Sequence, residues 1–365
     1  MDDCLIIGAG VVGLSLAYEL ASAGARVRVI DRQAAGREAS WAGAGILPAA
    51  TDRPGDPPYA RLAGLSHALH KRWADELRAL VELDNGFRPT GALYVACDEP
   101  AVAALEQQAA VWKANQIAAE ELPGQRRGGF EPHLGPIHRG YFVPDECQIR
   151  NPWHLRALLA ACQRFKVAVS EGVESFDFVV DNNRINGVET NIGRLRAKQY
   201  CVATGSWTAG VMSRLGVKIA VKPVRGQMVL LRGDPALPRH IINHGSRYLV
   251  PRGDGRVLVG STEEDVGYDR RNTAEGVRGL LDLAARLVPP LATFEIERTW
   301  AGLRPATADG LPYLGRIPGF SNAFIAAGHF RSGLHLSPGT ARVVGQAMRG
   351  VPTEIDLTPF RVDRG

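Results

Sequence analysis

The sequence predicts a mixed α/β fold with two domains, in which a Rossmann-type domain is interleaved with a domain built on an antiparallel sheet. An apolar strand, a glycine-rich turn, a helical pattern and a second strand follow one another over residues 4–32, the order of a βαβ unit. Apolar residues alternate within the runs between residues 223 and 260, which is typical of half-buried strands. The two kinds of segment alternate along 365 residues, a length that suffices for two domains.

The glycine-rich turn carries Gly-Ala-Gly-Val-Val-Gly over residues 8–13. Gly8 permits the tight turn, Gly10 lets the backbone approach a pyrophosphate, and Gly13 lets the helix pack closely on the strand. Asp31 follows Gly13 by 18 residues, about the spacing of a carboxylate that binds a ribose hydroxyl. In this strand-turn-helix-strand context the motif predicts a dinucleotide site, whereas isolated glycines would indicate only a flexible turn.

Periodicity and turn residues predict the other elements. We expect helices at 59–82, 99–118, from Asn151 and near 273–287. We expect strands at 91–96, 139–144, 167–173, 175–180, 184–190, 195–204, 223–232, 240–251 and 255–260. Grouping these segments by kind assigns residues 1–85, 144–218 and 301–365 to the first domain, and residues 86–143 and 219–300 to the second.

After Asp31 the chain does not continue into another βαβ unit. Residues 36–47 read GREASWAGAGIL, mostly small residues without a strand pattern. Such a segment suits a backbone that lies against the rest of a long cofactor, although a plain glycine and alanine loop has the same composition.

The charge balance gives little support for a nucleic-acid partner. The chain has 43 Lys and Arg against 38 Asp and Glu, a net charge of +5, and only 7% aromatic residues. The basic residues are scattered, so we find neither a stripe that follows phosphates nor a stacking platform for bases.

The cysteines and the N-terminus indicate a reducing compartment. The five cysteines are widely spaced and form neither a CxxC pair nor a metal-ligand spacing, so we expect small buried thiols and no metal. The uncharged run near the N-terminus is too short and too rich in glycine to span a bilayer. We therefore expect a cytoplasmic protein without a membrane partner.

Arg304 lies in the stretch WAGLRPATADGLPYLGR, among small and apolar residues that favour the protein interior. Because buried charges are usually paired, Arg304 either pairs with a core carboxylate such as Asp309 or binds an anionic ligand. A guanidinium grips a carboxylate through two parallel hydrogen bonds, which a lysine does not form.

Residues 323–348 predict a strand, a turn that holds His329 and Arg331, and a helix that begins near Gly333. The positive end of that helix dipole would face the cofactor. His329 is equally explained as a turn residue that bonds the backbone, and we assign it no general-base role.

Five motifs together resemble the glycine oxidases of thiamine biosynthesis, within the D-amino acid oxidase family of FAD-dependent oxidoreductases. They are GAGVVG with Asp31, REASWAGAG, RYLVPRGDGRVLVGST, WAGLRPATADGLPYLGR and AAGHFRSGLHLSPGTA. The resemblance covers nearly the whole chain. It implies a glutathione-reductase-like FAD-binding domain and non-covalent FAD, since residues 305–316 contain no cysteine.

The resemblance also implies site residues. Arg304 matches the arginine that binds the substrate carboxylate, Tyr248 the tyrosine beside it, and Arg331 a second pocket arginine, although Tyr248 alone would indicate only a strand tyrosine. No residue is assigned as a catalytic acid or base. The implied FAD contacts are Gly8, Gly10, Val11, Val12, Gly13, Asp31, Arg32, Ala39, Ser40, Ala44, Gly45, Ile46, Val173, His329, Phe330, Arg331, Ser332, Gly333, Leu334 and His335.

The implied reaction is oxidative deamination of glycine, sarcosine or a small D-amino acid, with hydride transfer to flavin and reduction of O₂ to H₂O₂. Two alternatives stay open, a D-amino acid dehydrogenase that passes electrons to a quinone or carrier, and a flavoprotein with a non-catalytic role. Ser332 and Ser246 depart from the usual asparagine and histidine, which leaves the substrate open. The family also suggests a homo-oligomer.

Overall fold

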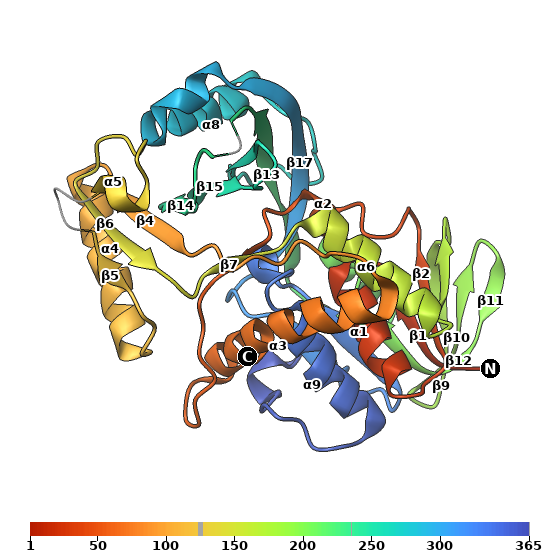
Figure 1. The fold of residues 1–365 in the computed structure, drawn as a ribbon. Helices are drawn as coiled ribbons and strands as arrows, with labels where there is room; N and C mark the ends of the chain where they lie inside the picture. The colour runs from red at the N-terminus through yellow and green to blue at the C-terminus, as the bar shows by residue number, and fades with distance from the viewer. Residues whose placement is uncertain (123–126, 235, 365) are drawn as a thin grey trace.

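The computed structural model describes residues 1–122, 127–234 and 236–364 (Figure 1). A six-stranded sheet has the order β18-β19-β12-β1-β2-β8. Its strands are parallel except for β18, which runs antiparallel to β19. The fold prediction of a Rossmann-type domain is therefore confirmed. The strands are β1 (Asp2–Ile7), β2 (Val27–Asp31), β8 (Ala168–Glu171), β12 (Ala197–Val202), β18 (Tyr313–Arg316) and β19 (Ala323–Ala327).

Close backbone packing fixes the turn between β1 and α1 (Val11–Ser22). Gly8 has φ of 112°, and a Cβ atom there would lie 2.3 Å from the carbonyl oxygen of Ala203 at the end of β12. A Cβ atom on Gly13 would lie 1.9 Å from the carbonyl oxygen of Gly8. No side chain fits at either position, so this turn brings the start of α1 against the ends of β1 and β12.

An eight-stranded sheet forms the second layer, in the order β17-β13-β16-β15-β14-β4-β6-β5. Its pairs are antiparallel, as predicted, except that β14 and β4 run parallel. The predicted strand at 240–251 is two strands joined at Gly245, which has φ of 56°. The strands are β4 (Ala92–Ala96), β5 (Glu120–Glu121), β6 (Arg139–Val143), β13 (Val221–Arg232), β14 (Ile241–His244), β15 (Arg247–Pro251), β16 (Arg256–Gly260) and β17 (Glu295–Thr307).

β17 was not predicted as a strand. It pairs with β13 over nearly its whole length, and Figure 1 shows it running from the second sheet toward the first domain. Its residues Trp300 to Thr307 are the first half of the Arg304 motif, so this strand carries Arg304 from one sheet toward the other. The residue boundaries of the two domains stay a prediction.

The helices cover the outer faces of both sheets. α8 packs its buried leucines on the second sheet, and α1 packs against α6 and α9 beside the first. The helices are α2 (Ala39–Ala42), α3 (Pro58–Val81), α4 (Glu99–Ala114), α5 (Arg127–Phe130), α6 (Asn151–Arg164), α7 (Thr208–Ser213), α8 (Ala274–Leu287) and α9 (Ser337–Arg349). The short strands are β3 (Ile46–Leu47) with β7 (Cys147–Gln148), and β9 (Ser175–Asp181), β10 (Arg184–Thr190) and β11 (Gly193–Leu195).

Three sequence expectations need correction. The last long helix begins at Ser337 rather than near Gly333, because Phe330 has φ of 47° and a series of turns precedes Pro338 in the first helical turn. Cys97 is only half-buried, whereas the other four cysteines are buried. Residues 39–42 form the short helix α2, which we did not predict within the segment 36–47. Among the described residues, no helix is long and apolar enough to cross a membrane.

Candidate active site

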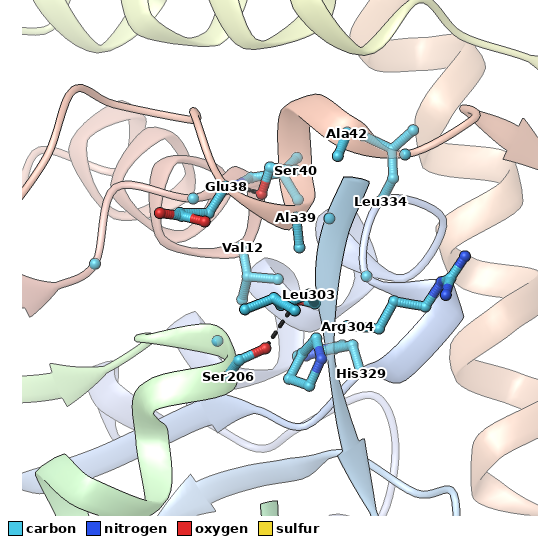
Figure 2. A pocket seen from close by; sticks show the side chains of 18 of the residues that line it. Val12, Glu38, Ala39, Ser40, Ala42, Ser206, Leu303, Arg304, His329 and Leu334 are labelled. Atoms are coloured by element: carbon cyan, nitrogen blue, oxygen red, sulfur yellow. Dashed lines mark hydrogen bonds between the residues drawn. The ribbon is translucent and has the colours of Figure 1, made fainter. Parts of the chain in front are cut away.

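A cavity of about 650 Å³ is lined by residues of both sheets (Figure 2). Every predicted cofactor or substrate residue lies in its wall except Gly13, which packs on Gly8 instead. Figure 2 shows Ala39 and Ser40 of α2 near Leu303 and Arg304 of β17, where the Ser206 hydroxyl donates a 2.8 Å hydrogen bond to the Leu303 carbonyl. Segments far apart in the sequence therefore meet at one cavity.

One end of the cavity is the start of α1. The backbone N–H of Ala9 donates to Asp31 Oδ2 at 2.7 Å, and that of Val11 donates to Ser40 Oγ at 2.9 Å. Burial raises the pKa of Asp31. The helix N-cap, Gly10, and the first helical residues, Val11 and Val12, line the cavity, so the positive end of α1 faces it. Such a glycine turn at a helix N-terminus suits a pyrophosphate.

Arg304 projects from β17 into the other part of the cavity. Its guanidinium donates to Ser261 Oγ at 2.6 Å and to the Thr262 carbonyl at 3.2 Å. No carboxylate of the described residues forms a salt bridge with it. The alternative that Arg304 pairs with Asp309 is wrong, because Asp309 is exposed and binds Arg364 at 2.8 Å. Burial lowers the pKa of Arg304, as expected of a cation without a counter-ion.

The structure places Tyr248 and Arg331 beside Arg304. The nearby Tyr248 phenol raises the pKa of Arg304, whereas the positive charge of Arg331 lowers it. Arg331 already has partners of its own. Its guanidinium donates to the Ser246 carbonyl at 2.7 Å and lies 3.5 Å from the Glu263 carboxylate. Of these two arginines, Arg331 has a salt bridge with a carboxylate and Arg304 has none.

Gly226 makes the room for the Arg304 side chain. A Cβ atom on Gly226 of β13 would lie 2.1 Å and 2.2 Å from the two terminal guanidinium nitrogens of Arg304. The guanidinium therefore lies directly over this glycine. The sequence motifs did not reveal Gly226, because its proximity to Arg304 depends on the register of β13 against β17.

Comparison with known proteins identifies the family. A family model described as "FAD dependent oxidoreductase" matches residues 3–347. The chain belongs to this family. It is 34% identical to the glycine oxidase of Pseudomonas aeruginosa and 32% identical to that of Pseudomonas putida. The alignments cover 98% of this chain in both cases, and 98% and 97% of the two relatives.

The same likeness holds for the three-dimensional structure. The crystal structure of glycine oxidase from Geobacillus kaustophilus superposes with a TM-score of 0.95 at 32% identity, covering all of this chain and 99% of the other. The expected family and fold are thereby confirmed. The protein is an FAD-dependent oxidoreductase of the glycine oxidase type, and its cavity suits FAD through the glycine turn and the start of α1.

The two histidines in the cavity wall of this FAD-dependent oxidoreductase, His329 and His335, are poor acid-base candidates. His329 is buried, its Nε2 contacts Thr340 Oγ1 at 3.0 Å, and burial lowers its pKa to about 4. Burial likewise lowers the pKa of His335 well below its usual value. Both are neutral at pH 7.

Sequence reasoning missed Tyr94 and Asn243, which line the cavity, and Glu146, which lies behind them. The Tyr94 hydroxyl donates to Glu146 Oε2 at 2.5 Å, and Asn243 Nδ2 donates to Oε1 at 3.1 Å. One signal was available for Asn243. The two-residue turn at Gly245 and Ser246 predicts a hairpin that places Asn243 opposite Tyr248, as the structure has it.

Glu146 makes stability depend on pH. The carboxyl is 1% exposed, and burial raises its pKa from 4.5 to about 7. Between these two values the unfolded chain releases a proton that the folded chain keeps, so folding becomes less favourable as pH rises from 4.5 to 7. We expect Glu146→Gln to lack this loss. The measurement is the difference in unfolding free energy between wild type and E146Q across this range. A constant difference would contradict the raised pKa of Glu146.

Proposed function

We propose that the protein catalyses oxidative deamination of glycine or another small amine-bearing carboxylate, such as sarcosine or a small D-amino acid, and reduces O₂ to H₂O₂. The observation that carries the proposal is Arg304, a guanidinium without a salt bridge among the described residues, which projects into the same cavity as the glycine turn. The names of the similar proteins, glycine oxidases, support the same substrate class.

The residues of the chain would bind and orient the substrate. Arg304 would hold the carboxylate through two parallel hydrogen bonds, with the Tyr248 hydroxyl beside it. Both come from packed strands of the second sheet, so the carboxylate would be held in a fixed place. Much of the rate enhancement would then come from orientation.

The redox chemistry would come from the cofactor. Bound FAD supplies the two-electron acceptor for the hydride of the α-carbon. The glycine turn with Asp31 would hold its pyrophosphate and ribose, and the segment from Ala39 to Ile46 would line the flavin side. His329 is neutral and contacts Thr340, so we assign no residue as a base for the substrate amine. The substrate would react with its amine unprotonated.

The test is to measure H₂O₂ and dye reduction under air with the FAD-loaded protein and glycine, sarcosine, D-alanine or D-proline. We expect H₂O₂ in proportion to the substrate consumed. Rapid dye reduction without H₂O₂ would contradict the oxidase and favour the D-amino acid dehydrogenase. If none of the four reacts with either acceptor, the proposed substrate class is wrong.

A further inference from the structure

A second polar part of the cavity lies away from Arg304, and the proposed reaction does not use it. Tyr94 of β4 and Asn243 of β14 both line the cavity. Tyr94 lies opposite Asn243 in the strand register, and Asn243 lies opposite Tyr248 of β15. Residues paired in this way share one face of a sheet. Tyr94, Asn243 and Tyr248 therefore form a row across β4, β14 and β15.

The Tyr248 side chain extends from this row toward Arg304. Its ring lies over Gly260 of β16, where a Cβ atom would be 2.7 Å from Tyr248 Cε2, and its hydroxyl is 3.6 Å from Met228 Sδ on β13. β13 is the strand whose Gly226 supports the Arg304 guanidinium. A ligand that contacts both Arg304 and Asn243 must extend along the ring of Tyr248.

Glu146 fixes the hydrogen-bonding role of this second region. Above its pKa of about 7 the Glu146 carboxyl is ionised. The Tyr94 hydroxyl then donates its one hydrogen to Glu146, so its oxygen can act only as an acceptor toward the cavity. Asn243 likewise donates its amide to Glu146, and no donor among the described residues contacts its Oδ1. The carboxyl behind them is 1% exposed. The region thus presents two oriented acceptors, opposite in character to the guanidinium groups of Arg304 and Arg331.

We propose that Tyr94 and Asn243, oriented by Glu146, bind an N–H donor at the end of the substrate's side chain while Arg304 binds the α-carboxylate. The inference rests on the proposed function and adds to its substrate class amino acids with a short side chain that ends in a primary amide or amine. The α-amine of glycine is on the carbon next to the carboxylate, so it stays at the Arg304 end. A pocket built to form hydrogen bonds discriminates against an analogue that leaves its polar groups unpaired.

The test compares D-asparagine with D-leucine, which has a similar shape but carries methyl groups in place of the amide. Each is titrated anaerobically into the FAD-loaded enzyme, and bleaching of the flavin absorbance is followed, with glycine as the reference substrate. We expect half-reduction at a concentration about tenfold or more lower for D-asparagine than for D-leucine, a difference typical of one unpaired polar contact.

Two variants remove the acceptors. In Glu146→Gln the new amide donates a hydrogen bond to one of the two residues and thereby changes its orientation. Tyr94→Phe removes one acceptor but keeps the ring that packs against Trp112. We expect either change to lower the preference for D-asparagine over both D-leucine and glycine severalfold. Tyr141→Phe is the matched control, because Tyr141 lies opposite Tyr94 on β6 but is not in the cavity wall, and it should keep the preference.

Three outcomes would overturn the inference, and they are distinguishable. If glycine bleaches the flavin but D-asparagine and D-leucine behave alike, the subsite is wrong and the proposed function stands. If Glu146→Gln and Tyr94→Phe weaken the response of the flavin to glycine as much as to D-asparagine, the acceptors serve the α-amine or the fold. If no amino acid bleaches the wild-type flavin, the proposed function fails and the subsite fails with it.

Discussion

Replacing Arg304 by alanine is expected to raise the substrate concentration for half-reduction of the flavin by about 100-fold. Truncating one partner of a buried charge-assisted pair costs about 2–5 kcal/mol, which is a factor of about 30 to 4,000. Arg304→Lys keeps the charge but not the planar fork, so most of the loss should persist. The measurement is an anaerobic titration of each FAD-loaded variant with glycine.

Arg298 provides the control for this experiment. It lies on the same strand, β17, but outside the cavity wall, with its guanidinium 6.0 Å from the Trp41 ring. Arg298→Ala should therefore titrate like the wild type. If Arg304→Ala binds glycine as well as Arg298→Ala does, Arg304 is not the carboxylate ligand.

Gly226→Ala is expected to weaken substrate binding without replacing any residue proposed to bind the substrate. The added methyl carbon would lie 2.1–2.4 Å from atoms of the Arg304 guanidinium, far inside van der Waals contact, so the guanidinium must move. Because bidentate hydrogen bonds depend on geometry, we expect roughly a tenfold to 100-fold weaker response to glycine, in line with the effect of small misplacements on catalytic groups. The FAD content should be retained, since the glycine turn and Asp31, which would hold the cofactor, are unchanged.

The matched control is Gly279→Ala on α8. A Cβ atom there has its nearest neighbour at 3.9 Å, which is ordinary contact, and alanine favours a helix over glycine. This variant should bind glycine normally and unfold at the same or a slightly higher temperature. Equal responses to glycine from the two alanine variants would show that the Gly226 position does not control the guanidinium.

Local signals predicted most of the fold. Alternating apolar residues marked β13, β15 and β16, and the strand-turn-helix-strand order marked the Rossmann-type domain, because both depend on neighbouring residues. β17 was missed because Glu295, Glu297 and Arg298 interrupt its apolar pattern. Its strand conformation depends on pairing with β13, which no local pattern contains. The start of α9 was misplaced because the turns before Pro338 also contain residues that favour helices.

The site was predictable to the extent that single motifs specify it. The family resemblance of their motifs implied Arg304 and Tyr248, and the structure brings both to one cavity. The positions of Gly226 and Glu146 follow only from register and from the packing of residues distant in sequence. For Arg304, the sequence left the pairing with Asp309 open, and only the position of Arg364 beside Asp309 removed it.

The most direct test of the account is anaerobic mixing of the FAD-loaded protein with glycine, sarcosine, D-alanine or D-proline, with the flavin absorbance followed over time. The account predicts that at least one of these substrates bleaches the wild-type flavin, and that the same substrate bleaches the Arg304→Ala variant only at concentrations about 100-fold higher, as expected for loss of a charge-assisted pair. A wild-type flavin that stays oxidised with all four, or an Arg304→Ala variant that is bleached equally well, would contradict it.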